Sequence, residues 1–288
     1  LQKEMLANVD KVQAVSDQQF EHSFRALASS IKSLSRLLQL TGKFDIGEVL
    51  GVPLLLQDMS IELLRGRIRK KCFIEVYLWS TLLDMVFRDP FKVFGPHFDA
   101  QSDVWKDIFG SDFFPDWPKP TTRSETWRYT VAEQVSQIVG VDLITEGKLK
   151  KKTGQDQEVR QDMDQSVLEV RIFVATSIES GLAMIASAMD SSLIQDVVDK
   201  AFTLALHMSL QRARFQITYP ALGARFVKEE MKCDSDGDGD EMSNGKVAVV
   251  INPGLTKWGD ALGKNLEYRY DIVPSFVQLE ATDGVSLI

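Results

Sequence analysis

The sequence predicts a mainly α fold, a multi-helix domain around one central buried helix with a small β hairpin or sheet at the C-terminal end. Residues 61–87 predict the central helix, because their second half is apolar on nearly every side of a helical turn. Apolar residues recur at helical spacing in several other stretches. From residue 246 the period changes, and short runs of branched and aromatic residues predict strands.

The central helix keeps only a narrow polar stripe, whose members are three or four residues apart. The stripe consists of Tyr77, Ser80, Thr81, Asp84 and Arg88. Because so little of this helix suits water, other elements must enclose it. We expect Asp58 or Ser60 to cap its first turn, and Pro90 ends it because proline lacks the amide proton.

Residues 1–15 are predicted to form an amphipathic helix or the tail of a coiled coil, since Leu1, Met5, Val9 and Val12 follow helical spacing. Two alternatives stay open, a helix docked on its own domain and a homo-oligomer formed through residues 1–15. We expect the chain to continue before Leu1. Residues 16–288 are predicted to form a single helical domain with the β element at its end.

The second predicted helix spans residues 17–40. Ser16 with Gln19 three residues later is typical of a capping box, and Gly42 suits the end of the helix. Residues 43–58 form a connection punctuated by glycine and proline. Thr122, with Glu125 three residues later, is expected to cap a helix that ends at Gly140.

Residues 90–120 alternate aromatic residues with prolines, and a short helix is expected from Ser102 to Phe109. A segment of this kind is either packed on the core or functional. The functional interpretation is a ligand pocket or docking groove. Its candidate residues are Trp105, Phe109, Phe113, Trp117 and Trp127.

Two further helices are predicted in the second half of the chain, after an exposed loop at residues 146–158. Residues 161–189 favour a helix, although VRIFVATSI within them also suits a strand. Asp190 or Ser191 is expected to cap the last helix. The pair Tyr219-Pro220 is expected to end this helical run. Residues 246–252 predict one strand, and residues 266–279 predict one or two more.

Composition restricts the class of protein. The 33 Lys and Arg against 41 Asp and Glu give a formal charge of −8, which disfavours broad contact with nucleic acid or anionic membranes. No apolar run reaches the roughly 18–20 residues that a membrane span needs. Two cysteines, Cys72 and Cys233, do not indicate a disulfide scaffold, although a bond between them stays open. We therefore expect a cytoplasmic protein without a secretory signal.

No motif predicts a catalytic residue, a metal site or a cofactor. Residues 234–245 begin like a calcium-binding EF-hand loop, but Gly245 stands where the bidentate glutamate is required, so a solvated acidic loop is favoured. His22, His97 and His207 are far apart, and His207 is expected to favour its charged form near a helix end. Two pairs of carboxylates could serve acid–base work, Asp103 with Asp112 and Asp162 with Asp164, although loop and helix surfaces commonly carry such residues.

A basic cluster opens the central helix. It consists of Arg65, Arg67, Arg69, Lys70 and Lys71. Side chains four residues apart share a face, so the cluster is either a solvated helix surface or a docking patch for an acidic partner, a phosphate-bearing ligand or RNA. RNA binding through residues 65–71 would depend steeply on salt. A second run, from Lys148 to Lys152, fits a charged loop.

Four segments carry a resemblance: FEHSFRALASSIKSLSRLL, RKKCFIEVYLWSTLLDMVFRDPFKVFG, SETWRYTVAEQV, and VAVVINPGLTKWGDALGKNLEYRYDIVPSFVQLE. Together they resemble the C-terminal helical region of a set of uncharacterised filamentous-fungal proteins that often carry a coiled coil upstream. The resemblance implies a cytoplasmic fungal protein and no known activity, so it assigns no functional residue.

The function that the sequence favours is a non-catalytic protein-interaction or scaffold module with protein partners. The first alternative is a small-ligand-binding protein or enzyme, with its pocket formed by the aromatic residues of segment 90–120. The second alternative is RNA binding through the basic cluster.

Overall fold

The structure, a computed structural model, describes residues 15–41, 49–57, 70–113, 116–149, 157–187, 189–233 and 245–280. Within these ranges it is mainly α with a small β element, which confirms the predicted fold class. The helices are α2 (Asp17–Leu37), α5 (Lys70–Leu82), α6 (Asp99–Phe109), α7 (Thr122–Val139), α8 (Val141–Glu146), α9 (Gln157–Ala183) and α10 (Ser191–Ser209). The strands are β1 (Arg214–Thr218), β2 (Met231–Cys233), β3 (Lys246–Asn252), β4 (Gly254–Trp258), β5 (Arg269–Val273) and β6 (Ser275–Glu280).

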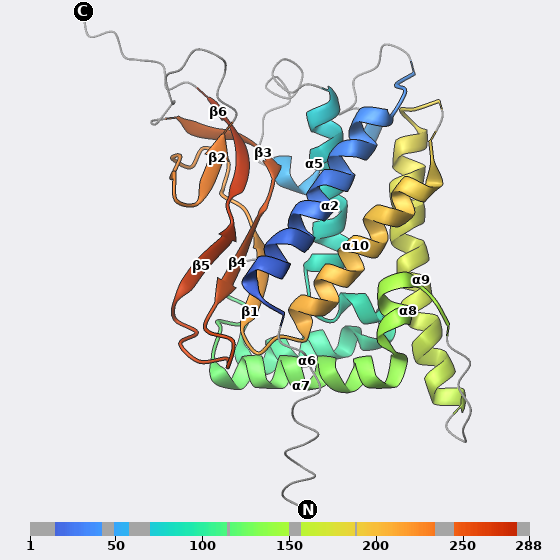
Figure 1. Cartoon of the computed structure of the whole chain (residues 1–288), viewed down its shortest axis with the longest axis vertical. Coiled ribbons are helices and arrows are strands. Elements are labelled where there is room, and N and C mark those ends of the chain that lie inside the picture. Colours follow the sequence, from blue (N-terminus) through green and yellow to red (C-terminus); the bar gives the residue numbers. More distant parts are fainter. Residues whose placement is uncertain are drawn as a thin grey trace, which may run out of the picture.

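The helices form a bundle with the strands along one side. Figure 1 shows α2, α10 and α9 side by side, with α5 behind them and with α6 and α7 across their lower ends. The strands stand beside α2, on the left of this view. The long helices therefore enclose α5 from one side, and the strands from another.

The central helix is enclosed as predicted. It runs through α5 and continues as a π-helical turn, Leu83–Phe87. Trp79 is 0% exposed and Leu83 is buried, because α5 contacts α2, α9, β3 and a short 3-10 turn at Leu54–Leu56. Residues 61–69, with the cap candidates Asp58 and Ser60, lie outside the described residues. The helix α10 shares the central position, since it contacts α2, α7, α8, α9 and β1.

The first predicted cap is confirmed, and the second is wrong by one residue. In α2, the amide of Gln19 donates to Ser16 Oγ at 3.2 Å, and the amide of Ser16 donates to Gln19 Oε1 at 2.9 Å. In α7 the cap is Thr121, whose backbone is extended, and its capping box closes with Ser124. Glu125 takes no part in that box, because its carboxylate is buried and is paired with Arg128 and Arg214.

The other helix predictions are resolved as follows. The strand interpretation of VRIFVATSI is wrong, because this stretch lies inside α9. Asp190 caps α10, accepting a hydrogen bond from the amide of Ser192 at 2.9 Å. The short helix expected from Ser102 begins earlier, at Asp99. The helix predicted over residues 17–40 ends earlier, at Leu37, because the backbone of Leu38 is extended, so Gly42 does not cap it. The amphipathic helix predicted at residues 1–15 falls, except for Val15, on residues 1–14, which are not described.

The β element is a long hairpin bent at two prolines. β3 pairs antiparallel with β6 in one three-stranded sheet, and β4 pairs antiparallel with β5 in the other. Pro253 separates β3 from β4, and Pro274 separates β5 from β6, so each arm leaves one sheet for the other where the backbone has no amide proton. Gly254 must be glycine here, since a Cβ would lie 2.7 Å from the carbonyl oxygen of Val273.

Three strands were not predicted. β1 was expected to continue the last helix up to Tyr219, and instead it pairs antiparallel with β4. The sequence RFQIT alternates polar and apolar residues, a strand signal that the interpretation as continued helix overlooks. Four of its five residues are buried. β2 pairs parallel with β6. β4 begins at Gly254, directly after Pro253, the residue that follows the strand predicted over 246–252.

Two expectations on the class of protein can be compared with the structure. No disulfide joins Cys72 and Cys233, which are both partly buried thiols. In the part of the chain that is described, every helix is too short or too polar to cross a lipid bilayer.

A buried acid in the central helix makes a pH-dependent contribution to stability. Burial raises the pKa of Glu75, and the hydroxyl of Ser35 and the charges of Lys32 and Arg36 offset the increase only in part. A carboxyl with a raised pKa holds its proton more tightly in the folded state, so stability falls as the pH rises from about 4.5 through the folded-state pKa. We expect Glu75→Gln to raise the melting temperature at neutral pH, because glutamine still accepts from Ser35 Oγ without a charge.

Thermal melts from about pH 4 to about pH 8 measure this effect. The advantage of Glu75→Gln over the unsubstituted protein should grow with pH. The same change at the partly exposed Glu133 on α7 is the control and should give no such trend. A difference in melting temperature that stays constant across the pH range would contradict the argument.

Candidate functional site

Two clefts flank the π-helical turn at the end of the central helix. A π turn accommodates one more residue than an α turn and is often found at functional sites. Here it spans Leu83–Phe87, and Asp84, Met85 and Arg88 line both clefts. The turn therefore forms a wall that the two clefts share.

The first cleft, the tyrosine cleft, has a volume of about 710 Å³. The whole predicted polar stripe of the central helix lines it, so the stripe faces a cleft. Apolar side chains form much of the rest of its wall. The lining residues are Leu50, Val52, Pro53, Leu54, Gln57, Tyr77, Ser80, Thr81, Leu83, Asp84, Met85, Phe87, Arg88, Asp116, Ile217 and Tyr219.

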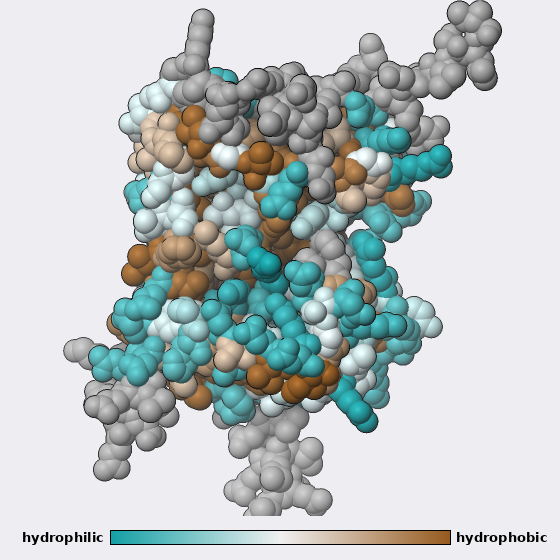
Figure 2. Space-filling view, turned by 180° about the vertical axis from the view of Figure 1, so that it is seen from behind, coloured by the Kyte–Doolittle hydropathy of each residue, from teal (hydrophilic) through white to brown (hydrophobic). Residues whose placement is uncertain are grey.

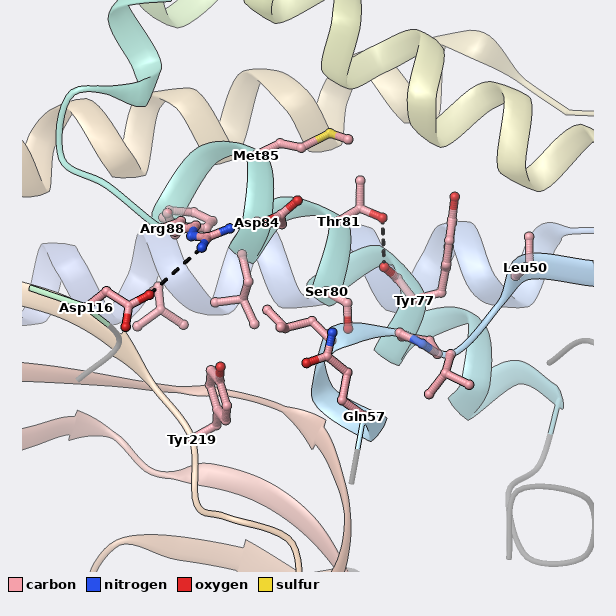
Figure 3. Close-up of a pocket in the computed structure, with 16 residues that line it drawn as sticks. Leu50, Gln57, Tyr77, Ser80, Thr81, Asp84, Met85, Arg88, Asp116 and Tyr219 are labelled. Carbon is pink, nitrogen blue, oxygen red and sulfur yellow. Dashed lines mark hydrogen bonds and ion pairs between the residues drawn. The ribbon is translucent and has the colours of Figure 1, made fainter. Parts of the chain in front are cut away.

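Arg88 forms ion pairs with both aspartates that line the tyrosine cleft. Its Nη1 donates to Asp84 Oδ1 at 3.0 Å, and its Nη2 lies 3.8 Å from Asp116 Oδ2. Figure 3 shows these groups at one end of the cleft, with the phenol of Tyr219 pointing toward the central helix from the strand side. Asp116 has a φ of 98°, a left-handed conformation that is uncommon for a residue with a side chain and is often found at functional sites.

The two tyrosines keep their protons at neutral pH. Burial raises the pKa of Tyr219, and the charge of Asp116 raises it further, while Arg88 lowers it in part. Burial also raises the pKa of Tyr77. Both phenols are therefore neutral groups that can donate or accept hydrogen bonds, and neither is suited to act as a phenolate base.

The second cleft, the acidic cleft, has a volume of about 940 Å³. Residues from segment 90–120 form one wall, and α9 contributes Val170 and the 61% exposed Phe173. Figure 2 shows apolar surface beside strongly polar surface at middle height on the face opposite to that in Figure 1. The lining residues are Asp84, Met85, Arg88, Asp89, Lys92, Gly95, Pro96, Asp99, Ser102, Asp103, Lys106, Glu169, Val170 and Phe173.

Every cation of the acidic cleft already faces a carboxylate. Besides the Arg88–Asp84 pair, Lys92 Nζ lies 2.9 Å from Asp99 Oδ1. Lys106 Nζ lies 3.4 Å from Oδ2 of the buried Asp89. The arrangement leaves the wall with a net negative charge, because five carboxylates face three cations.

Behind the clefts lies a buried ionic cluster of Glu125, Arg128 and Arg214. Arg214 Nε donates to Glu125 Oε1 at 3.0 Å, and Arg128 Nε donates to Oε2 at 2.7 Å. Arg128 also ends α10, since its guanidinium donates to the carbonyl oxygens of Ser209 (2.7 Å) and Gln211 (2.6 Å). The cluster has no access to water, so its role is to join α7 to α10 and β1.

Three of the five predicted aromatic pocket residues pack around this cluster. The guanidinium of Arg214 lies over the rings of Trp105, Phe113 and Trp117 at 5.3–5.9 Å. Trp127 packs edge-on against the ring of Phe91 at 5.7 Å, and Phe109 is partly buried. None of the five lines the tyrosine cleft or the acidic cleft.

Trp117 still contributes indirectly, because its indole donates to the carbonyl oxygen of Arg88 at 2.7 Å and so holds the backbone of a residue that lines both clefts. The polar residues of segment 90–120 line the acidic cleft in place of the aromatic ones.

The remaining predicted residues are dispersed. Arg65, Arg67 and Arg69 lie outside the described residues, and Lys70 and Lys71 are exposed at the start of α5. The acidic loop from Asp234 to Asp240, with the rest of the EF-hand-like stretch before Gly245, also lies outside them, as do Lys150, Lys151 and Lys152. Lys148 is exposed.

The histidines do not meet. His22 and His97 are exposed. The expectation for His207 is wrong, because burial lowers its pKa and disfavours its charged form. Of the weighed carboxylates, Asp103 lines the acidic cleft without Asp112. Among the described residues, no group of three or more histidines, cysteines and carboxylates is placed to hold a metal ion.

A comparison of the chain with protein-family models, curated proteins and solved structures gives no match. Sequence reasoning found the polar stripe but did not find Asp89, Asp116 or Tyr219. The only signal for them was that they lie next to turns and prolines.

Proposed function

We propose that this chain is a non-catalytic binding module that holds a small amphiphilic ligand beside the π-helical turn. The observation that carries the proposal is that two clefts of ligand size share Asp84, Met85 and Arg88. Pockets for small molecules commonly reach 300–1,000 Å³ and combine apolar walls with a few convergent polar groups. Both clefts fit this description.

The composition of the walls supports binding over catalysis. Neither histidine nor cysteine lines either cleft. The charged side chains are largely engaged in ion pairs, and a general base or a nucleophile needs a side chain poised to exchange a proton with a neighbour. The arrangement can orient a polar group of a ligand, and it offers no such pair.

Filling the shared wall is expected to abolish ligand binding. Met85 is partly buried and lines both clefts, so Met85→Trp should occupy space in each. In a thermal-shift screen of small amines, carboxylates and alcohols, ligands that stabilise the protein should lose at least about tenfold in affinity in Met85→Trp. Calorimetric titration of each ligand found in the screen measures the loss.

The control is Met184→Trp, which makes the same change at an exposed position after α9, away from both clefts. It should bind every ligand as tightly as the unsubstituted protein does. Ligands that bind Met85→Trp unchanged would place their site elsewhere and would contradict the proposal.

A second candidate is the protein-interaction module that the sequence favours. Ile172 and Phe173 are neighbours in the sequence of α9 and both are more than half exposed, and large exposed apolar side chains are one feature of docking sites. A partner docked on α9 would tolerate Met85→Trp, which distinguishes this candidate from the first. Oligomerisation through residues 1–15 and RNA binding through residues 65–71 stay predictions, because residues 1–14 and 58–69 are not described.

A further inference from the structure

Two buried polar atoms of residues that line the acidic cleft have no hydrogen-bond partner among the described residues. Asp89 is 2% exposed, and its Oδ1 accepts from the amide of Phe91 at 2.9 Å, while its Oδ2 accepts no hydrogen bond from any residue that the structure describes. Ser102 is 5% exposed, and its Oγ likewise has no hydrogen-bond partner in that part of the chain. Buried polar groups in folded proteins nearly always have a partner, so a pair of exceptions lining one cleft requires an explanation.

Lys106 partly neutralises the charge of Asp89 but forms no hydrogen bond with its Oδ2. It lies four residues after Ser102 on α6, so the two side chains share a face of the helix. Its Nζ is an ion-pair partner of Asp89 Oδ2 at 3.4 Å, without a hydrogen bond between the two groups. The carboxylate therefore keeps capacity for a donor that approaches it more closely.

The charge of the cleft favours a cation as that donor. Asp103 and Glu169 line the cleft and form no ion pair with any described residue, whereas the three cations of the wall are each paired. An anionic ligand would meet uncompensated carboxylates. A metal ion does not fit, because the carboxylates of the described residues are not grouped as metal ligands.

The cleft also has an apolar part. Met85, Val170 and Phe173 line it, and Phe173 is more than half exposed. An aromatic face also attracts an organic cation, with a preference over a neutral group of the same shape. Charge, unsatisfied acceptors and the apolar wall therefore indicate one ligand chemistry.

We propose that the acidic cleft binds an organic cation, a primary ammonium group on an apolar body, with the ammonium directed to Asp89 and Ser102 and the body against Phe173. This inference rests on the proposed function and gives the class of ligand for one of its two clefts. The ammonium can belong to a free amine or to a lysine side chain of a peptide.

The test is calorimetric titration of the whole chain with n-hexylamine, n-hexanol and n-hexanoate, which share a body and differ in charge. A lysine peptide with blocked ends is titrated in parallel. Binding of hexylamine identifies a free amine, and binding of the peptide alone identifies a lysine side chain, and both support the proposal. Hexanol that binds as tightly as hexylamine, or hexanoate that binds more tightly, overturns the inference of a cationic ligand. If Met85→Trp then loses the binding of hexanol or hexanoate, the proposed function is still supported. Absence of binding by both ammonium probes also overturns the inference.

Variants locate the ammonium group. Asp89→Asn keeps the acceptor for Phe91 and removes the charge, so the affinity for the ammonium probe should fall roughly tenfold or more. Ser102→Ala removes an atom without a partner, so it should fold normally and still lose about threefold or more. Lys106→Met removes the competing cation and should raise the affinity.

The matched control is Asp107→Asn, an exposed carboxylate on the same helix that does not line the cleft, and it should leave the affinity unchanged. Because Ser102→Ala needs no repacking of ions, it tests the proposal even where Asp89→Asn fails to fold. Unchanged affinity in Ser102→Ala, or reduced affinity in Lys106→Met, overturns the assignment.

Discussion

Replacing Glu125 with leucine is expected to lower the free energy of unfolding by about 3–5 kcal/mol, because the change leaves two buried arginines without their carboxylate. Glu125 pairs with Arg128 on its own helix and with Arg214 on β1, and all three side chains are shielded from water. An uncompensated charge in such surroundings cannot be solvated. Chemical denaturation at neutral pH measures the loss.

The control for Glu125→Leu is Glu133→Leu, the same change at a partly exposed position of α7. It should cost less than about 1 kcal/mol. Adding Arg214→Met to Glu125→Leu should cost less than the sum of the two single changes, since each single change leaves a buried partner unpaired. Additive costs, or equal losses for Glu125→Leu and Glu133→Leu, would contradict the argument.

The direction of the pKa shift gives the same prediction a pH dependence. Burial alone would raise the pKa of Glu125, but the charges of Arg128 and Arg214 outweigh it and hold the pKa below its ordinary value of 4.5. The contribution of this carboxylate is therefore complete above about pH 4.5 and is lost as the pH falls through the folded-state value. The difference between Glu125→Leu and the unsubstituted protein should shrink only in acid.

The helices could be predicted because their signals are local. The apolar spacing in α2 and α9 and the capping box at Ser16 depend on residues one or two turns apart. The strand β1 was missed, because its pairing partner β4 is distant in sequence and the helical run of α10 ends only a few residues before it. The sequence RFQIT does alternate polar and apolar residues, but five residues directly after a long helical run are a short signal.

The candidate site divides in the same way. The polar stripe from Tyr77 to Arg88 follows from one helical period, and it does line the tyrosine cleft. The acidic cleft joins α6 to α9, and no local pattern brings Ser102 close to Phe173. The aromatic residues of segment 90–120 were the strongest signal for a pocket, and they pack instead around Arg214, a long-range contact that spacing does not reveal.

Replacing Trp79 with alanine is expected to lower the free energy of unfolding by about 3–5 kcal/mol, since it removes a fully buried aromatic side chain from the central helix. The ring stacks on Phe24 of α2 at 5.3 Å, and the indole donates to Asn252 Oδ1 of β3 at 2.6 Å. One side chain thus joins the helical bundle to the β element, so both should lose stability together. Denaturation followed by circular dichroism and by tryptophan fluorescence measures the cost with two probes.

Trp127→Ala on α7 is the control, because that ring is only partly buried and should cost less. Trp79→Phe separates the two roles of the side chain. It keeps most of the apolar contact with Phe24 and loses the donor to Asn252. Its free energy of unfolding should therefore fall between those of the unsubstituted protein and Trp79→Ala. If Trp79→Ala were no more destabilising than Trp127→Ala, the central helix would not be the element on which the bundle and the sheets depend.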